Sequence, residues 1–505
     1  MPRLNEENPE SAAVPDAGLE TRGTTVRLTI ASMNAAGEGR AFLDGREWDV
    51  EGAVSGETVD ALLVHAGQRR THARCVKVVS TSPYLAADPC PALAAPSACG
   101  GCPLGRLDYA HQLEEKRELL LEALEEQGFD ADSLPEVPAV HPSPAPGLYR
   151  NKASWWADLD AEGDLVFGLR TGGTAHVSPE SLQCRQTPAW MAALARETAR
   201  ALTPGVKAGG LPFIKGLVCR DAGELELNLE TAPGRGVEGS ETNKQRTRLA
   251  GLVTGETTPE EHEALTRELA SDAAFMETLE RLGLSGFVLI ENTRGNNLTG
   301  GDLKAFHGET MVTATIDGLA FEVAIDTFLQ VNTKQTRALY AKALEWADFR
   351  SDDVFLDLYC GIGTMTLMGA RSVESAHGVE WVESSVERAR ENARVNGIEN
   401  AAFTAGPVEK VLPGLLARGI KPTVCVADPA FKGLAPDVPA TLTRSPIERL
   451  VMVSCNPKTF ARDAAALVRL GWRLEAIELF DMFPGALHVE TIGKFTKKTT
   501  CMLHS

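Results

Sequence analysis

The most constraining feature of this chain is a regular alternation of short apolar runs and helix-like stretches across residues 326–505. Apolar runs at 354–358, 424–427 and 450–453 have the length of buried strands, and helix-like stretches lie between them. This alternation is typical of a doubly wound, mainly parallel sheet, which is an α/β fold. Ligands bind such sheets at the carboxyl ends of the strands, so the residues directly after these runs are candidates for a functional site.

One helix of this region has recognisable ends. Ser384 and Glu387 have the spacing of a capping box, and Gly397 suits the position just beyond a helix C-terminus. The sequence therefore predicts a helix over residues 384–396, following a strand that ends at Glu380.

The chain before residue 326 divides into three parts. Residues 1–22 are polar and acidic, which predicts a disordered tail. Residues 23–82 contain short alternating runs punctuated by glycines, the pattern of a small β-barrel. Residues 83–325 begin with a loop rich in Pro, Cys and Gly and continue as a central mixed α+β domain.

Within that central part, residues 107–128 are predicted to be helical, and residues 165–169 and 286–290 to be strands. Residues 207–260 are rich in Gly and Thr, the composition of an insertion.

Charge and hydropathy bound the class of protein. No run approaches the roughly 20 apolar residues of a membrane span, and the N-terminus lacks the pattern of a signal peptide. We therefore expect a cytoplasmic protein without a membrane partner. The formal net charge of -19 places any contact with nucleic-acid phosphates on local basic patches. The candidates are Arg69, Arg70, His72, Arg74 and Lys77, and a second group of Lys494, Lys497 and Lys498. Charge alone equally allows both groups to be solvated faces.

The first strand of the predicted sheet leads into a glycine turn. Gly361 and Gly363 let a backbone approach a ligand closely, and Glu380 ends the next strand, where a carboxylate can accept hydrogen bonds from ribose hydroxyls. Thr366 stands where a pyrophosphate-binding turn has its third glycine. The loop therefore favours S-adenosylmethionine, which has no phosphates, over a dinucleotide.

A cysteine follows another strand of the sheet. Cys455 lies between the run at 450–453 and a helix-like stretch at 459–470, where a nearby helix N-terminus would lower the pKa of the thiol. A buried structural cysteine is the alternative, and for an isolated cysteine it is the better one.

Two carboxylates bear on that choice. Asp428 ends a strand that faces the same crevice if the sheet is wound as expected, and Glu490 follows a turn near the C-terminus. Glu490 is a candidate general base, although taken alone it fits a solvated strand glutamate better. One cysteine and one base beside a methyl donor suit methylation of uracil carbon 5. A thiolate adds to carbon 6, carbon 5 attacks the methyl group, and the base removes the carbon 5 proton before the cysteine leaves.

The chain has ten cysteines, which in a reducing compartment should be thiols, metal ligands or catalysts. Cys99 and Cys102, separated by two glycines, have the spacing of a metal clip.

Six motifs of this chain occur in the order typical of one enzyme family. They are Phe328-Leu329-Gln330-Val331-Asn332, Asp357-Leu358-Tyr359-Cys360-Gly361-Ile362-Gly363, Asn392-Ala393-Arg394-Val395-Asn396-Gly397, Ser454-Cys455-Asn456-Pro457, Asp481-Met482-Phe483-Pro484 and His488-Val489-Glu490. From about Thr24 onward the chain resembles the RNA 5-methyluridine methyltransferase family, whose members act on rRNA or tRNA.

The resemblance implies a TRAM barrel related to oligonucleotide-binding folds, a central domain, and a Rossmann-like methyltransferase domain at 326–505. It implies that Cys455 is the nucleophile and Glu490 the base. The residues implied to line the S-adenosylmethionine site are Gln330, Tyr359, Thr364, Glu380 and Asp428, beside Gly361 and Gly363. The implied substrate is a uridine in an RNA loop, in rRNA rather than tRNA, and we expect a monomer.

The resemblance also implies a role for the cysteine-rich loop. Members of the iron–sulfur type place three cysteines before the central domain and one within it, which here match Cys90, Cys99, Cys102 and Cys184. Four thiolates suit zinc or a 4Fe–4S cluster, and the family favours the cluster. A radical enzyme would need a Cys-x-x-x-Cys-x-x-Cys run, which the chain lacks.

Two positions depart from the family pattern. Phe431 stands where the family carries an arginine after Asp-Pro-Pro, and Pro407 replaces an Asn or Asp near the adenine. An RNA-binding homologue with impaired catalysis is therefore the alternative function. A small-molecule or DNA methyltransferase is disfavoured by the predicted barrel and the ordered motifs.

Overall fold

The computed structural model describes residues 23–67, 70–93, 99–130, 134–170, 176–222, 247–295 and 297–497. The predicted tail at 1–22, Arg69, Lys498 and residues 223–246 of the predicted insertion lie outside them. The chain forms two compact units, Met1–Leu85 and Ala86–Ser505. The finer domain boundaries remain a prediction from the sequence.

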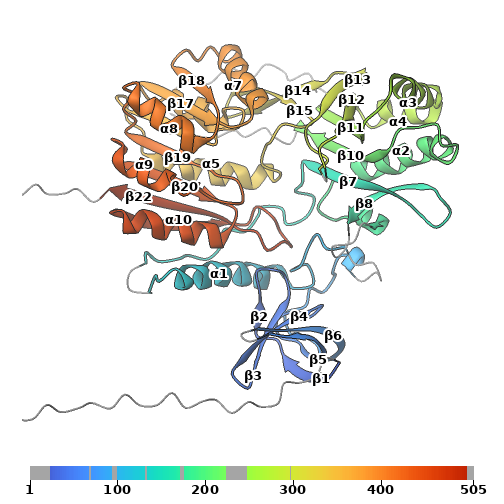
Figure 1. The fold of residues 1–505 in the computed structure, drawn as a ribbon, viewed down its shortest axis with the longest axis horizontal. Helices are drawn as coiled ribbons and strands as arrows, with labels where there is room; N and C mark the ends of the chain where they lie inside the picture. Colours follow the sequence, from blue (N-terminus) through green and yellow to red (C-terminus); the bar gives the residue numbers. More distant parts are fainter. Residues whose placement is uncertain are drawn as a thin grey trace, which may run out of the picture. The chain divides into compact units, whose positions relative to one another are not determined.

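The first unit is a curled six-stranded sheet (blue in Figure 1), as the sequence predicts. Its strand order is β1-β5-β6-β4-β3-β2, and β1 also approaches β3, as in a small barrel. The strands are β1 (Thr25–Thr29), β2 (Ser32–Met33), β3 (Gly39–Leu43), β4 (Arg46–Glu51), β5 (Thr58–Ala66) and β6 (Arg70–Ser80). Asp44 and Gly45, both with positive φ, form the two-residue turn that β3 and β4 need to pair as a hairpin.

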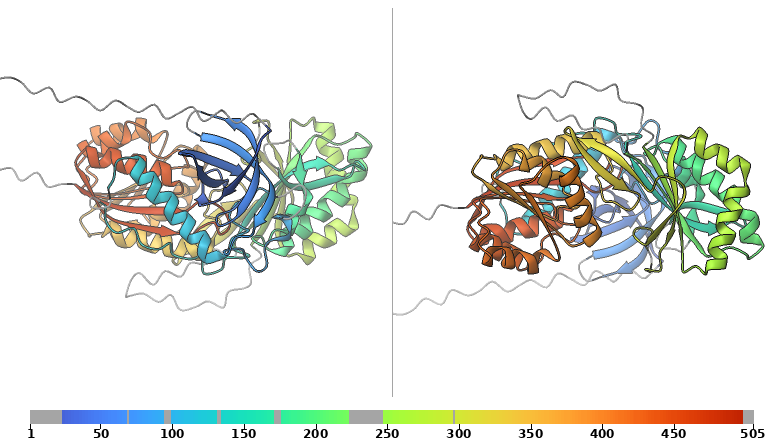
Figure 2. Two further views of the ribbon diagram at one scale, coloured as in Figure 1. Left: turned by 90° about the horizontal axis from the view of Figure 1, so that it is seen from below. Right: turned by 90° about the horizontal axis from the view of Figure 1, so that it is seen from above.

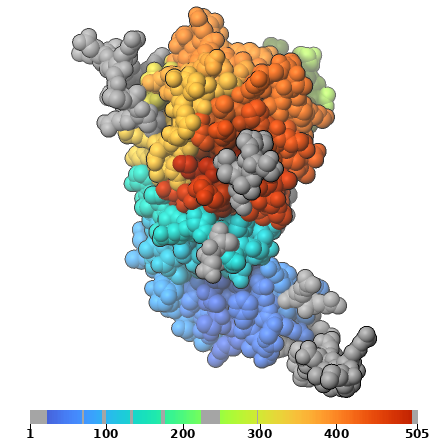
Figure 3. Space-filling model, turned by 90° about the vertical axis from the view of Figure 1, so that its left-hand side faces the viewer, coloured from blue at the N-terminus to red at the C-terminus, as the bar shows by residue number. Residues whose placement is uncertain are grey.

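The N-terminal half of the second unit contains a seven-stranded mixed sheet in the order β13-β12-β11-β10-β7-β8-β9. Its strands are β7 (Lys152–Leu159), β8 (Leu165–Arg170), β9 (Val177–Ser178), β10 (Ile214–Asp221), β11 (Arg248–Thr254), β12 (Leu284–Glu291) and β13 (Asp302–Gly308). Helices α2 (Ala189–Lys207), α3 (Pro259–Ser271) and α4 (Ala273–Arg281) cover one outer face of this sheet (Figure 2). Helix α1 (Tyr109–Glu126) confirms the predicted helix but packs elsewhere, against α10 (Pro457–Arg469). Figure 3 shows the turquoise part of this unit directly against its orange and red C-terminal part.

A hairpin of β14 (Met311–Ile316) and β15 (Leu319–Ala324) leads into the C-terminal sheet. That sheet has the order β18-β17-β16-β19-β20-β22-β21 and is parallel as far as β20. Its strands are β16 (Val354–Leu358), β17 (Ser375–Glu380), β18 (Ala401–Ala405), β19 (Val424–Ala427), β20 (Arg449–Ser454), β21 (Trp472–Phe480) and β22 (Glu490–Lys497). The doubly wound α/β fold predicted from the sequence is confirmed.

Helices cover both faces of this sheet. One face packs on α5 (Thr333–Ala347), α6 (Thr364–Ala370) and α7 (Glu383–Val395). The other packs on α8 (Val408–Ala417), α9 (Val438–Arg444), α10 and α1. Strand order reverses between the neighbours β16 and β19, so the loops after these strands flank the crevice where such sheets bind ligands.

The predicted capping box at the start of α7 is wrong. The helix begins at Glu383, its N-cap is Val382, and no side chain caps it. The chain already turns at Val382, whose carbonyl accepts from the N–H groups of Ser385 and Val386, so Ser384 lies inside the first turn. The predicted C-terminus is confirmed, with Gly397 at φ 63° just beyond the helix.

No helix in the described part of the chain has the length and apolar character needed to cross a membrane.

Candidate active site

The loop after β16 is shaped by its backbone. Tyr359, Gly361 and Gly363 all have positive φ, which folds residues 359–363 into a tight turn ahead of α6. Tyr359 is a strained exception among these, since a side chain disfavours φ of 68°. Strain of this kind is concentrated at functional sites.

Glu380, at the end of β17, is held beside this loop by two hydrogen bonds from backbone N–H groups. Its Oε2 accepts from Gly361 N at 3.1 Å and its Oε1 from Val382 N at 2.9 Å. The structure therefore brings together Gly361 and Glu380, which the sequence placed in the cofactor site. Thr364 begins α6 directly after this loop.

Asp357 lies beneath the loop with no exposed surface. Its Oδ2 accepts from Thr366 Oγ1 at 2.5 Å, and burial raises the pKa of the carboxyl to about 7. Its Oδ1 has no hydrogen-bond partner among the described residues. Buried acceptors in folded proteins are usually hydrogen-bonded, so this oxygen is available to a water molecule or a ligand.

Cys455 and Glu490 are brought together by strand pairing. Cys455 follows the last residue of β20, and Glu490 begins β22, the antiparallel neighbour of β20. Ser454 lies opposite Thr491 in this ladder, so the backbones of Cys455 and Glu490 are adjacent. Glu490 is 2% exposed and its Oε2 has no partner among the described residues, so it is not a solvated strand glutamate.

Asp428 completes this group from the end of β19. Burial, and then the charges of Glu490 and Asp428, together raise the pKa of Cys455 to about 12. Burial and then Asp428 hold the pKa of Glu490 well above its usual range, and burial raises that of Asp428. These mutual effects place the three side chains in one neighbourhood.

The expected lowering of the Cys455 pKa is therefore wrong. The cysteine does precede α10, which Asn456 caps by accepting from Lys458 N at 3.1 Å. Burial and two carboxylates outweigh the helix terminus, because both disfavour a thiolate. The thiol is half-buried, so it is neither fully enclosed nor freely exposed.

Tyr340 of α5 belongs to the same group, although sequence reasoning did not single it out. Burial raises the pKa of its hydroxyl, and the charges of Asp428, Asp357 and Glu490 raise it further. Its position in the sequence has the ordinary spacing of a core residue in a helix, so no pattern could have identified it.

Aromatic rings surround His488 beside the cysteine. The ring of His488 lies 5.5 Å from that of Phe431 and 5.8 Å from that of Phe483, both edge-on. His488 also forms a hydrogen bond with the backbone of Cys455. Asn456 Nδ2 donates to the Phe431 carbonyl at 3.3 Å, so the 54% exposed Phe431 lies at the edge of this site.

The other family departure, Pro407, is the N-cap of α8 and makes no side-chain cap. Gln330 is 6% exposed, and its backbone carbonyl accepts from Asn151 Nδ2 at 3.0 Å.

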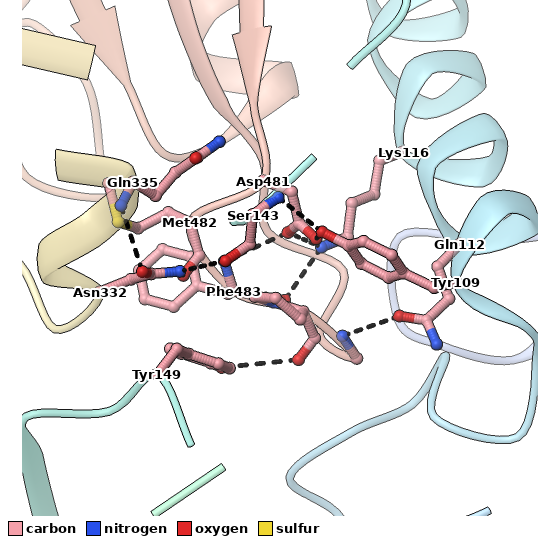
Figure 4. Close-up of polar contacts among 12 residues, drawn as sticks. Tyr109, Gln112, Lys116, Ser143, Tyr149, Asn332, Gln335, Asp481, Met482 and Phe483 are labelled. Carbon is pink, nitrogen blue, oxygen red and sulfur yellow. Dashed lines mark hydrogen bonds and ion pairs between the residues drawn. The ribbon is translucent and has the colours of Figure 1, made fainter. Parts of the chain in front are cut away.

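Residues 481–486, between β21 and β22, are held by side chains from distant parts of the sequence (Figure 4). The Asp481 carboxylate forms an ion pair with Lys116 Nζ at 2.5 Å and accepts a hydrogen bond from the Tyr109 hydroxyl at 2.8 Å. Both partners lie on α1. Lys116 Nζ also donates to the Phe483 carbonyl at 2.9 Å. Lys116 lies on the apolar stripe of α1 with Leu119 and Leu120, and a lysine on such a stripe is the sequence signal that reasoning missed.

The same loop is fixed from two further directions. Asn332 Nδ2 donates to the Met482 carbonyl at 3.1 Å and to Ser143 Oγ at 3.0 Å. Gly485 donates to Gln112 Oε1 at 2.9 Å and accepts from Leu104 N at 2.9 Å. This framework sets the path of the chain immediately before His488 and Glu490.

The four cysteines singled out for a metal site lie in one neighbourhood. Burial, and then the charges of Cys184, Cys99 and Cys90, raise the pKa of Cys102 to about 12 against an opposing effect of Arg150. Burial likewise raises the pKa of Cys99, with contributions from Cys184 and Cys90. Among the described residues no three of these thiols lie within 4.8 Å of one another. Thiolates bound to one zinc at about 2.3 Å would lie closer than that.

In the first unit, ligand atoms of Glu38, Asp49 and His72 do lie within 4.8 Å of one another. The amide of Asn34 already donates to both carboxylates, at 3.1 and 2.7 Å. The group is therefore satisfied as a hydrogen-bonded cluster.

The candidate basic patches are partly neutralised. Arg70 pairs with Glu47 at 3.3 Å, and His72 lies 3.9 Å from Asp49. Lys497 donates to the Ser445 carbonyl and lies over the ring of Trp472.

Comparison with known proteins agrees with the fold described above. A model described as a methyltransferase domain matches residues 349–425. A protein of Gloeobacter violaceus named as an uncharacterized RNA methyltransferase is 34% identical over 484 residues, which cover 95% of this chain and 98% of that protein. One of Halalkalibacterium halodurans with the same description is 29% identical and is covered to 97%.

Among solved structures, a tRNA (uracil-54, C5)-methyltransferase of Pyrococcus abyssi in complex with S-adenosyl-L-homocysteine superposes with a TM-score of 0.63. The match covers 93% of this chain and 100% of that one at 22% identity, which shows a shared fold.

Proposed function

Since this chain belongs to the RNA methyltransferase family, we propose that it methylates carbon 5 of a uridine in RNA through a covalent cysteine adduct. The observation that supports this most is the pairing of β20 with β22, which sets Cys455 beside Glu490 at the carboxyl edge of the sheet. A nucleophile and a base in one half-buried site are what addition to uracil and later proton removal require.

The methyl donor fits the loop between β16 and α6. Glu380 is held by two backbone N–H groups in a position to accept from ribose hydroxyls, and Gly361 and Gly363 leave room for close approach. Bound S-adenosylmethionine would supply an electrophilic methyl group on sulfur. Gln330, Tyr359, Thr364 and Asp428 are the further residues proposed to line its site.

In the proposed reaction, the Cys455 thiol loses its proton to solvent as its sulfur forms a bond to uracil carbon 6, and the electron pair of the 5,6 double bond moves toward the carbonyl at carbon 4. Carbon 5 then takes the methyl group, and S-adenosylhomocysteine is the leaving group. Glu490 accepts the proton from carbon 5, and the electron pair of that bond re-forms the double bond as sulfur leaves. The raised pKa of Glu490 suits it to hold that proton near neutral pH.

The target uridine must leave its stack to reach a half-buried thiol, so we propose a flipped base. Phe431 and His488 would form the aromatic wall of its pocket, since their rings stand at the edge of the site next to Cys455.

We also propose that Cys90, Cys99, Cys102 and Cys184 hold a 4Fe–4S cluster. The charges of Cys90 and Cys184 contribute to the raised pKa values of Cys99 and Cys102, which supports a shared site, and the resemblance to the iron–sulfur type favours the cluster over zinc. Cys102 Sγ would lie only 3.1 Å from a Cβ at Gly485. The cluster would therefore support the loop that precedes Glu490 rather than take part in methyl transfer.

The test is formation of a covalent complex with RNA containing 5-fluorouridine, in which fluorine replaces the proton that the base removes. We expect a methylated adduct stable in denaturing gels with the native protein, and none with Cys455→Ala. rRNA and tRNA fragments are compared, and rRNA is the expected substrate. If neither RNA forms a covalent adduct with the reduced, iron-loaded protein, the proposal is contradicted.

The alternative of an impaired RNA-binding homologue is favoured by Phe431 and Pro407, which lack the polar groups usual at their positions. It predicts RNA binding without measurable affinity for S-adenosylmethionine. Calorimetric titration with S-adenosylmethionine separates the two functions.

A further inference from the structure

Two cations lie directly opposite each other in the central sheet. Arg220 of β10 pairs in register with Lys152 of β7, its antiparallel neighbour. Figure 1 labels these two strands in the central sheet. Residues opposite each other in such a ladder project from the same face of the sheet, and like charges there repel. Arg220 has no exposed surface, so solvent does little to screen this repulsion.

The hydrogen bonding of Arg220 is incomplete. Its Nη2 donates to the Thr327 carbonyl, whereas its Nε and Nη1 are buried without a partner among the described residues. The neighbouring Asn151 donates its amide to the Gln330 carbonyl at 3.0 Å and to Thr333 Oγ1 at 3.0 Å. Arg220 thus keeps two donors unused beside the segment that carries Gln330.

A third cation and one carboxylate complete the group. Arg388 of α7 forms an ion pair with Asp326 at 3.1 Å and donates to Thr327 Oγ1 at 3.2 Å. Asp326 is thereby already engaged, and Lys152 has no ion pair among the described residues. Burial and then the charge of Arg220 lower the pKa of Lys152 to about 7, which an adjacent anion would reverse.

Among the described residues, the group therefore holds two arginines, one lysine and a single carboxylate. Buried charges are retained in proteins when they are paired, and an arginine with free donors is suited to a planar or tetrahedral oxyanion. Phe328, next to Thr327, is 68% exposed, so this edge of the group is close to the surface. Lys152 and Arg388 are both partly exposed and offer the route of approach.

We propose that Lys152, Arg220 and Arg388 form an anion subsite that binds one phosphate of the substrate RNA. This inference rests on the proposed function, and it adds a contact that would anchor the RNA backbone while the target uridine leaves its stack. Asp326 remains paired with Arg388. The carboxylate of the methyl donor shares this chemistry and is the competing ligand that the experiment must separate.

The test compares Lys152→Gln with Lys215→Gln, a buried lysine of the neighbouring strand β10 that serves as the control. Lys215 Nζ donates to the carbonyls of Asn292 at 2.9 Å and Gly295 at 3.0 Å, so it is satisfied by the protein itself. We expect Lys152→Gln to weaken binding of an RNA fragment about 5- to 20-fold. The slope of log K against log salt should fall by about 1. Lys215→Gln should leave that slope unchanged.

A second measurement locates the anion. A scan of methylphosphonate linkages should find one position at which the native protein loses affinity and Lys152→Gln does not. Calorimetry with S-adenosylhomocysteine should give equal affinities for both proteins.

A loss of S-adenosylhomocysteine affinity in Lys152→Gln would assign the subsite to the cofactor and overturn the proposal, as would an unchanged salt slope. Adduct formation is scored separately with 5-fluorouridine RNA. An adduct with an unchanged slope refutes the subsite alone, whereas a changed slope without any adduct refutes uridine methylation alone.

Discussion

The ammonium of Lys116 lies 2.5 Å from Oδ1 of Asp481, and neither side chain has any exposed surface. The two residues are 365 positions apart in the sequence. Their contact ties α1 to residues 481–486, the loop that leads to Glu490. A buried ion pair is rarely a net source of stability, but loss of one partner leaves an uncompensated charge.

Lys116→Met should therefore destabilise the second unit by about 3–5 kcal/mol, because Asp481 would stay buried without its cation. The double variant Lys116→Met/Asp481→Asn should recover most of that loss, since it removes both charges and keeps an acceptor for Tyr109. Urea unfolding of the three proteins measures this. Equal stability of the single and double variants would contradict a paired role.

The pKa of the Cys455 thiol gives a second prediction. Glu490 and Asp428 both raise that pKa, so neutralising Glu490 should lower it and increase the thiolate fraction at a given pH. Alkylation of Cys455 by iodoacetamide, mapped by peptide mass spectrometry, should be at least about threefold faster in Glu490→Gln at pH 8.5. The difference should grow as the pH rises through the raised pKa of Glu490, because only the ionised carboxylate repels a thiolate. An equal or slower rate in Glu490→Gln would show that burial alone controls the thiol.

The cysteine group should affect activity through the loop rather than through the chemistry. Cys102→Ser should abolish iron and sulfide binding and lower turnover, since Cys102 contacts the chain at Gly485, close to Glu490. Cys75→Ser, a half-buried cysteine of the first unit, is the control and should retain full iron content. Iron and sulfide analysis of anaerobically purified protein, together with 5-methyluridine formation, checks both. Full turnover by iron-free Cys102→Ser would exclude the supporting role.

Asp357 makes stability depend on pH with a defined sign. Its folded-state pKa of about 7 lies above the unfolded value of about 3.9, so the folded state favours the protonated carboxyl. Its stabilising contribution is complete below about pH 4 and is lost as the pH rises to 7. The unfolding temperature of Asp357→Asn should therefore exceed that of the native protein by more at pH 8 than at pH 5.

Asp353 is the control of opposite sign. Burial raises the pKa of Asp353, but hydrogen bonds from the side chains of Thr423 and Arg449 outweigh it and lower that pKa. Asp353→Asn should therefore reduce the free energy of unfolding most at neutral pH and least as the pH falls below 4. If both variants changed the stability with the same dependence on pH, the raised pKa of Asp357 would be ruled out.

Much of the fold follows from the sequence, because apolar runs and glycine turns are local signals. The strands that end at Glu380 and directly before Asp428 and Cys455 were all predicted, as was the carboxyl edge that they share. The start of α7 was not predicted correctly. Ser384 has the right chemistry for an N-cap, but the turn at Val382 sets the position at which the helix begins.

The sequence by itself therefore determined the kind of sheet, the order of the motifs and the residue types available for chemistry. Only the tertiary structure decided how those residues ionise. Cys455 precedes a helix, yet its pKa rises, because β22 sets Glu490 beside it and burial removes water from both. Lys116, Tyr340 and Arg220 gained their significance in the same way. Desolvation and charge pairing depend on distances in space, and separation along the chain does not encode them.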